Sequence, residues 1–156
     1  MNKVHFSSAK HDYETPDDFF RYWNWIFNFT VDVCANENNA KCSKFYCESD
    51  WNSPEESLDQ QAWAVFHPSS VARCWMNPPY GREIGKWVAK AYEESQKGCL
   101  VVCLLPARTD TKWWHEYCTR GTIKFIKGRL SFKGAPSTAP FPSAIVIFWP
   151  AGMEMV

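Results

Sequence analysis

"VARCWMNPPYGREIGKWVAKAYEESQKGCLVVCLLP", residues 71–106, contains the pattern from which the fold class follows. The apolar run 71–76 predicts a short buried strand, and the spacing of apolar residues from Ile84 predicts a helix that ends at Gly98. The apolar run after the helix predicts a second strand. Two strands that are joined by a helix in this way pair in parallel, and their connection is a right-handed crossover. Residues 77–80 therefore lie in a strand-to-helix connection, where open α/β sheets bind their ligands.

The rest of the chain continues this alternation of strands and helices. Thr15 and Pro16 predict the start of a helix, because a threonine hydroxyl caps helices and proline suits the first turn. Further predicted elements are a strand over 29–35, a turn-rich segment over 36–53, a short helix over 54–63, a helix opened by Thr109 or Asp110, a strand, turn and strand over 122–134, and a strand over 143–149. We therefore expect a doubly wound, mostly parallel α/β sheet with an antiparallel strand addition near the C-terminus. Residues 1–11 predict a loose N-terminal arm.

Charge is divided unequally between the two halves of the chain, although the net charge is zero. Residues 1–70 hold five basic and eleven acidic side chains, whereas residues 71–156 hold twelve and six. The second half contains a basic run without an acid, made of Arg120, Lys124, Lys127, Arg129 and Lys133. If these side chains share one face, they form the footprint that a polyanion needs; the alternative is an ordinary solvated strand.

Aromatic residues are abundant, with nine tryptophans, eleven phenylalanines and six tyrosines. We expect most of them in the core, and some could serve as stacking platforms for nucleobases. Seven cysteines without a signal peptide or a membrane-spanning run indicate a reducing cytoplasm. The separations of Cys34, Cys42 and Cys47 fit no common zinc pattern, so we expect no metal ion. Because the sequence has no membrane-spanning run, we also expect no membrane partner.

Residues 77–80, "NPPY", combine two acceptor oxygens with an aromatic ring. Asn77 carries one acceptor on its side chain, and the carbonyl of Pro78 can point at a ligand. Two adjacent acceptors match an exocyclic –NH₂ group, as on adenine, and Tyr80 can stack on the ring that carries it. Acceptors on both hydrogens localise the lone pair of the nitrogen, so the amine can attack an electrophilic methyl group without a strong base. A proline-stiffened turn with a core tyrosine is the alternative.

Several dispersed blocks resemble one family, in order along the chain. "YETPDDFF" (13–20), "VDVCAN" (31–36) and "NPPYG" (77–81) resemble the motifs of amino-methyltransferases that use S-adenosylmethionine. The resemblance extends to "LLPARTDTKWWHEY" (104–117), "IKFIKGRLSF" (123–132) and "APFPSAIVIF" (139–148). Over residues 12–149 the chain resembles the phage-type DNA N6-adenine methyltransferases of the Dam family. This implies one Rossmann-like methyltransferase domain over residues 1–156, acting on double-stranded DNA in a host bacterial cytoplasm.

The resemblance also implies a set of cofactor contacts. Thr15 and Pro16 would lie near the methionine end of S-adenosylmethionine, where a helix N-terminus suits a carboxylate. Asp32 would approach the positive charge of the cofactor, or else cap the following loop, and Cys34 and Ala35 would line the same turn. Asn77 would lie beside the cofactor as well. Glu56 or Asp59 is a candidate contact for the adenine of the cofactor.

Contacts to DNA follow from the same resemblance. Asn77 and the carbonyl of Pro78 would hold the amine of a flipped-out adenine, Pro79 would stiffen the turn, and Tyr80 would stack on the base. Arg108, with Thr109 and Asp110, would face the same cleft. The predicted phosphate or groove contacts are Lys124, Lys127, Arg129 and Lys133.

One segment departs from the broader pattern of these enzymes, which follow the first strand with a glycine-rich loop. Residues 36–39 are "NENN", and we expect the turn to form because asparagine tolerates positive φ. Two other functions stay open from the sequence: methylation of a glutamine amide in a protein, and a DNA-binding relative that has lost catalysis.

Overall fold

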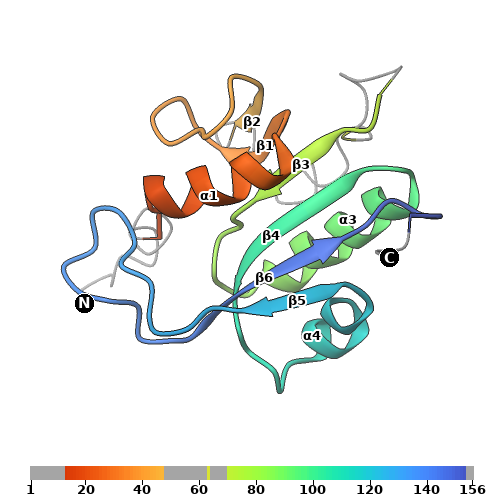
Figure 1. Cartoon of the computed structure of the whole chain (residues 1–156). Helices are drawn as coiled ribbons and strands as arrows, with labels where there is room; N and C mark the ends of the chain where they lie inside the picture. The colour runs from red at the N-terminus through yellow and green to blue at the C-terminus, as the bar shows by residue number, and fades with distance from the viewer. Residues whose placement is uncertain (1–12, 48–62, 64–69, 154–156) are drawn as a thin grey trace, which may run out of the picture.

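The computed structural model describes residues 13–47, 63 and 70–153. The helices are α1 (Asp17–Phe27), α3 (Ile84–Gln96), α4 (Lys112–Glu116) and the one-turn 3₁₀ helix η3 (Cys118–Arg120). The strands are β1 (Val31–Ala35), β2 (Phe45–Cys47), β3 (Arg73–Met76), β4 (Leu100–Pro106), β5 (Thr122–Phe125) and β6 (Ser143–Phe148). These strands form one sheet in the order β2-β1-β3-β4-β6-β5 (Figure 1).

The sheet is mostly parallel, as predicted. β2, β1, β3 and β4 pair in parallel with their neighbours, and β3 and β4 are joined through α3 as residues 71–106 indicate. β6 is antiparallel to both β4 and β5, so β5 runs in the same direction as β4. The expected antiparallel addition is therefore confirmed as one strand, which lies between β4 and the edge strand β5.

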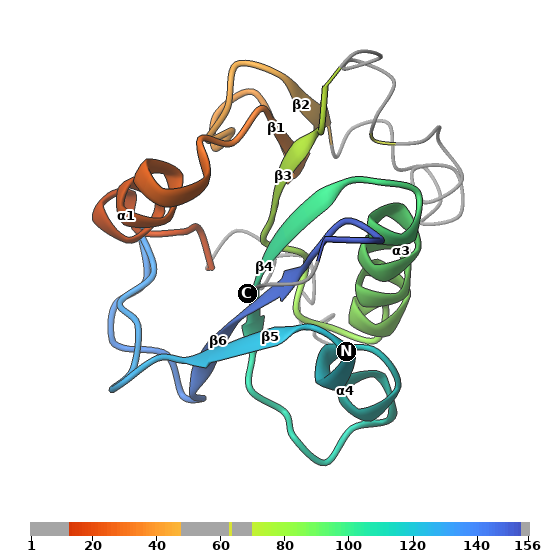
Figure 2. The ribbon, with the colours of Figure 1, turned by 45° about the vertical axis from the view of Figure 1, so that its right-hand side comes forward.

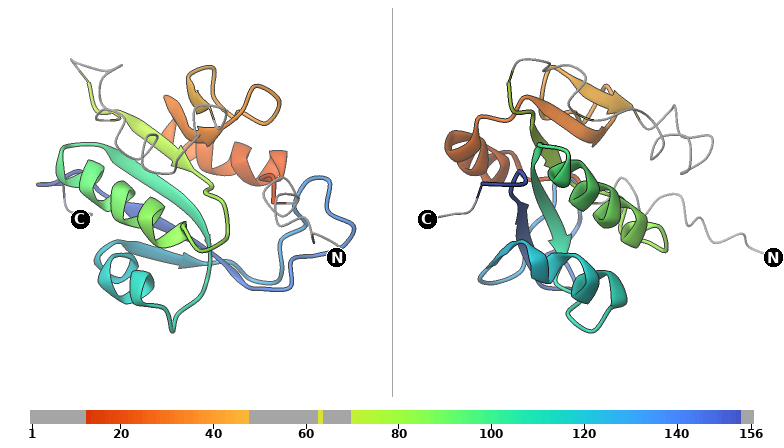
Figure 3. Two further views of the ribbon diagram at one scale, coloured as in Figure 1. Left: turned by 180° about the vertical axis from the view of Figure 1, so that it is seen from behind. Right: turned by 90° about the vertical axis from the view of Figure 1, so that its right-hand side faces the viewer.

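Helices cover both faces of the sheet. α1 lies on one face, and α3 and α4 lie on the other (Figures 1 and 3). Successive residues of β4 alternate between two cores: Val101 belongs to the core that contains Trp87 of α3, and Val102 to the core that contains Trp23 of α1. All residues of β1, β4 and β6 are buried, because a sheet covered on both faces leaves its central strands no contact with water.

The apolar face of α1 explains why this segment forms a helix and packs where it does. Aromatic residues recur at spacings of three and four, and the ring of Phe20 contacts the buried ring of Trp75 edge-on, with centroids 5.3 Å apart. α1 ends at Phe27, and the C-cap residue Asn28 adopts a left-handed conformation with φ of 49°. The side chain of Asn24 then accepts a hydrogen bond from the N–H of Phe29 at 2.8 Å and fixes the exit of the chain toward β1.

The two helices predicted to begin near Thr15 and near Thr109 both form, but the predicted capping residues are wrong. Thr15 does not cap α1: Pro16 holds the N-cap position without a side-chain cap bond, and the Thr15 hydroxyl is instead bonded to Asn77. α4 is not opened by Thr109 or Asp110. These residues form a turn, and the hydroxyl of Thr111 accepts from the N–H of Trp114 at 3.4 Å.

Two strand predictions also differ from the structure. β2 lies within the segment predicted to be irregular. The sequence does not predict it, because a three-residue edge strand has too few residues to show an alternating pattern. The predicted second strand of 122–134 does not form. β5 pairs with β6 instead, and the following segment turns toward the start of α1, where Lys133 makes an isolated antiparallel bridge with Glu14 (Figure 2). Phe132 of this segment is buried in the core on the α1 side.

Some predictions fall outside the described residues. The loose arm over 1–11, the short helix over 54–63 (apart from Trp63) and the candidate contacts Glu56 and Asp59 belong to this group. Within the described part of the chain, no helix combines the length and the apolar character that crossing a membrane requires.

We predict that Gly121→Ala destabilises the fold. A Cβ atom at Gly121 would lie 2.7 Å from the backbone oxygen of Ile147, so β5 would have to move away from β6. Overpacking of this kind lowers the free energy of unfolding by about 1–3 kcal/mol, which urea denaturation can measure. Gly81→Ala is the matched control, because nothing lies within 4 Å of its added Cβ atom. Equal stability of the two variants would contradict the prediction.

Candidate functional site

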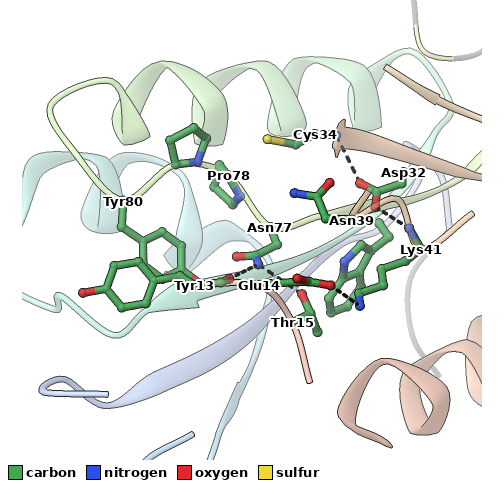
Figure 4. A pocket seen from close by; sticks show the side chains of 12 residues that line it. Tyr13, Glu14, Thr15, Asp32, Cys34, Asn39, Lys41, Asn77, Pro78 and Tyr80 are labelled. Carbon is green, nitrogen blue, oxygen red and sulfur yellow. Dashed lines mark hydrogen bonds and ion pairs between the residues drawn. The ribbon is translucent and has the colours of Figure 1, made fainter. Parts of the chain in front are cut away.

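A pocket lies at the carboxyl ends of β1 and β3, where the order of strands reverses because β2 and β3 flank β1 (Figure 4). Ligands of open α/β sheets bind at such a point. Of the predicted site residues, the pocket is lined by Thr15, Asp32, Cys34, Asn77, Pro78, Pro79 and Tyr80. Pro16 and Ala35, also predicted beside the cofactor, do not line it. The free volume is about 30 Å³, which is enough to admit water.

The side-chain amide of Asn77 has a fixed orientation. Its Nδ2 donates to the backbone carbonyl of Tyr13 at 2.8 Å and to the hydroxyl of Thr15 at 3.0 Å. A backbone carbonyl can only accept, so the amide nitrogen must face Tyr13 and the amide oxygen must face the other way. This Oδ1 is buried and has no hydrogen-bond partner among the described residues.

A second acceptor lies next to this oxygen along the chain. The carbonyl of Pro78 makes no hydrogen bond with the described residues, and Pro79 cannot donate one because proline has no N–H. A buried acceptor without a partner destabilises a fold by about 1–3 kcal/mol, so its presence in a pocket calls for a functional reason.

Tyr80 is anchored at the other end of the tetrad. Its hydroxyl donates to the backbone oxygen of Leu104 at 3.1 Å. Burial raises the pKa of Tyr80 well above its usual value, and the positive charge of Arg108 opposes this only in part, so the hydroxyl stays protonated at neutral pH. The ring is stacked on that of Tyr13, with centroids 5.3 Å apart and an interplanar angle of 23°.

Asp32 holds the loop that follows β1. Its carboxylate accepts from the N–H of Cys34 at 3.2 Å and from the N–H of Lys41 at 3.0 Å, while it also lines the pocket. The structure therefore assigns Asp32 the capping role. Its predicted cofactor contact stays a prediction.

The loop over 36–39 forms its turn in a different way from the one expected. None of these asparagines has a positive φ. The side-chain oxygen of Asn36 instead accepts from the N–H groups of Asn38 and Asn39, and the Asn39 side chain accepts from the N–H of Asn36 at 2.7 Å. Side-chain hydrogen bonds thus replace the left-handed backbone that glycines would supply.

Four charged side chains join three segments around the pocket. Lys41 from the loop after β1 reaches Asp17 at 3.0 Å and Glu14 at 3.4 Å, and Lys133 reaches the same two acids at 3.2 and 3.7 Å. Hydrogen bonds from Lys41 and then Lys133 hold the pKa of Asp17 below its usual value. We call this set the Lys41–Lys133 network.

The predicted basic run does not form a single patch. Lys124, Lys127 and Arg129 are exposed near the carboxyl end of β5 and form no ion pair with the described residues. Arg120 lies at the opposite end of β5, with its guanidinium 5.4 Å from the ring centre of Tyr92.

The other predicted DNA contacts are placed as follows. Arg108 is exposed just after the carboxyl end of β4, at the edge of the sheet where the pocket lies. Lys133 is exposed but ion-paired within the Lys41–Lys133 network. Thr109 is fixed by its backbone oxygen, which lies 2.7 Å from Nε2 of His115. Asp110 is exposed in the same turn.

Sequence reasoning missed five residues that line the pocket: Tyr13, Glu14, Asn39, Lys41 and Trp75. Tyr13 and Glu14 directly precede the predicted Thr15 and lie in the block "YETPDDFF", and this position is their only signal. Lys41 shows no sequence signal, because its role depends on the geometry of the loop after β1, which the spacing of residues along the chain does not reveal. In the described part of the chain, no three His, Cys, Asp or Glu side chains are grouped so as to hold a metal ion.

We predict that Asp17→Asn lowers the melting temperature at pH 7 and that its effect fades in acid. Because the pKa of Asp17 is lowered in the fold, its ion pairs stabilise the protein above the ordinary pKa of aspartate, about 3.9, and are lost as pH falls through the lower folded value. Thermal melts of both proteins between pH 7 and pH 3 measure this. Asp18→Asn removes the same charge outside the network, and an equal effect of that variant would contradict the prediction.

Comparison with known proteins identifies the family to which this chain is related. The sequence profile described as DNA N-6-adenine-methyltransferase (Dam) matches residues 4–151. A protein of Haemophilus phage HP1 (strain HP1c1) named DNA N-6-adenine-methyltransferase is 31% identical over 122 residues, which cover 76% of this chain and 62% of the relative. A protein of Escherichia phage T1 with the same name is 30% identical over 105 residues, or 67% of this chain and 39% of the relative. The chain thus spans less than two thirds of either relative and belongs to the DNA N-6-adenine-methyltransferase (Dam) family.

Proposed function

We propose that the chain transfers a methyl group from S-adenosylmethionine to the exocyclic N6 amine of adenine in double-stranded DNA. The observation that carries the proposal is the buried Oδ1 of Asn77, which has no partner among the described residues and whose direction is set by Tyr13 and Thr15. The names of the family and of the two phage relatives support DNA adenine as the acceptor.

In this mechanism the tetrad acts on the amine nitrogen. Asn77 Oδ1 and the carbonyl of Pro78 accept the two N–H hydrogens, and Tyr80 stacks on the ring of the base. Both acceptors draw the lone pair of the nitrogen away from the ring, and the positioned dipoles stabilise the positive charge that develops on the amine. The nitrogen forms a bond to the methyl carbon, the carbon–sulfur bond breaks with its electron pair left on sulfur, and the amine releases one proton to water. The base must leave the duplex to reach this pocket.

The residues at the strand ends fit a methyl donor of this chemistry. S-adenosylmethionine, when bound, supplies an electrophilic methyl group on a positively charged sulfur. The N-terminus of α1 after Thr15 and Pro16 has no side-chain cap, so its free N–H groups suit the carboxylate of the donor. The carboxylate of Asp32 supplies negative charge at the pocket, and Cys34 forms part of the pocket wall.

We also infer that the sheet is Rossmann-like and doubly wound. The helices on both faces and the reversal of strand order at β1 support this inference. The site then occupies the position that such sheets use for nucleotides.

The proposed DNA surface surrounds this pocket. Lys124, Lys127 and Arg129 are exposed without ion pairs in the described part of the chain, so they are available to phosphates. Arg108 lies at the same edge, after β4. Lys133 contacts a phosphate only by exchanging its acidic partners for it.

We predict that Asn77→Ala lowers the rate of methyl transfer by roughly 100-fold or more, because loss of one positioned dipole has an effect of this size. Transfer of a labelled methyl group to plasmid DNA and to protein measures both the rate and the acceptor class. Asn38→Ala is the control, since this exposed asparagine lies outside the pocket. A rate near that of the wild type in folded Asn77→Ala would contradict the mechanism. Label in protein but not in DNA from the wild type would favour the glutamine-amide alternative.

We predict that DNA binding weakens steeply with salt and that the triple variant Lys124→Gln, Lys127→Gln, Arg129→Gln reduces this dependence. If each side chain contacts one phosphate, the slope of log K against log salt changes by roughly 2–3 units. Fluorescence anisotropy with a labelled duplex over a range of salt concentrations measures the slope. Arg120→Gln is the control at the far end of β5, and an unchanged slope in the triple variant would remove these residues from the DNA surface.

A further inference from the structure

Tyr13 contacts both of the groups that the proposed function assigns to the target base. Its backbone carbonyl accepts the hydrogen bond from Asn77 Nδ2, and its ring is stacked on the ring of Tyr80 (Figure 4). Among the described residues, the two tyrosine rings also share two aromatic neighbours. Phe141 lies edge-on to both, at centroid distances of 5.3 Å from Tyr13 and 5.5 Å from Tyr80, and Phe132 does the same at 5.3 and 6.2 Å.

A planar base cannot stack on the face of Tyr80 that Tyr13 covers while both rings stay in place. Stacked rings with centroids 5.3 Å apart are in direct contact, and a base between them would need about twice the thickness of one aromatic ring. A base that stacks on this face of Tyr80 therefore requires one of the two rings to move.

The hydrogen bonds identify Tyr13 as the ring that moves. The hydroxyl of Tyr80 is fixed to the backbone of Leu104, whereas the hydroxyl of Tyr13 makes no hydrogen bond to any of the described residues. Tyr13 can also rotate its side chain without moving its backbone carbonyl. The amide of Asn77 therefore keeps its orientation while the ring swings away.

We propose that Tyr13 is a gate residue that occupies the base-stacking face of Tyr80 and is exchanged there for the flipped adenine. This inference rests on the proposed function and extends it, because it adds a residue that controls access of the base. Base and tyrosine compete for one aromatic surface. Stacking of the base on Tyr80 is offset by the loss of the Tyr13–Tyr80 pair, so removing the ring of Tyr13 strengthens base binding.

The test compares two single-stranded oligonucleotides: an oligodeoxyadenylate and an oligomer of the same length with abasic sites. The dissociation constant of the abasic oligomer divided by that of the oligodeoxyadenylate is the ratio to measure. It isolates the contribution of the bases from that of the phosphates. Tyr13→Leu, which keeps an apolar side chain against Phe132 and Phe141, should raise this ratio by roughly two- to tenfold, because an aromatic pair is worth this much. Tyr13→Phe keeps the ring and should bind as the wild type does.

Tyr80 provides the matched control. In the Tyr80→Leu background, Tyr13→Leu should give no gain, because the surface for which base and tyrosine compete is absent. A ratio that is unchanged or lower in folded Tyr13→Leu overturns the proposal, as does a gain that persists without Tyr80. If Tyr13→Leu melts at a lower temperature, Tyr13→Met gives the same comparison, because its flexible side chain fills the same space.

The gate and the proposed function fail separately in this design. The binding ratio is measured without a methyl donor, so it depends only on stacking at Tyr80. If the wild-type protein methylates no adenine, the proposed function is contradicted even if the ratio rises in Tyr13→Leu. If the wild-type protein methylates adenine but the ratio is unchanged in Tyr13→Leu, only the gate proposal is contradicted.

Discussion

The two hydrogen bonds donated by Asn77 are the interaction on which the site depends. They connect the end of β3 to the segment before α1, more than sixty residues earlier in the chain. The Tyr13 carbonyl cannot donate, so it forces the amide nitrogen toward itself and leaves the buried oxygen on the other side without a partner among the described residues. An amide without this constraint could rotate and satisfy its oxygen elsewhere. The catalytic proposal therefore depends on where residues 13–15 lie as much as on the tetrad itself.

A buried, unpaired acceptor is unfavourable, and the surrounding structure must hold it in place. Beneath the pocket, Trp75 is fully buried, with the rings of Phe20 and Phe29 each 5.3 Å from its own. This aromatic packing seats α1 against the sheet and keeps the segment before it next to β3. The heavy aromatic content thus supports the position of the polar site as well as the stability of the core.

The central strands and α3 are predictable from sequence because apolar periodicity, proline and glycine act over a few residues. The place of the tetrad between β3 and α3 is predictable for the same reason, since the signals that flank it are local. The roles of Thr15, Tyr13 and Lys41 are not, because each depends on a partner in a distant segment. Thr15 has the sequence of a helix cap, yet its hydroxyl is bonded to Asn77, and no local pattern distinguishes these two uses. Long-range pairing also explains why the segment after β5 crosses to Glu14 and forms no hairpin.

The Lys41–Lys133 network determines which basic side chains near the pocket already have acidic partners. Asp17 and Glu14 neutralise two lysines next to the pocket, and the same contacts hold three chain segments together. A phosphate that drew Lys133 away would leave Asp17 with only Lys41 and would loosen the start of α1. In the proposed complex, electrostatic attraction to DNA therefore falls mainly on the cations that have no acidic partner in the described chain, whereas the network holds Glu14 and Asp17, which flank Thr15.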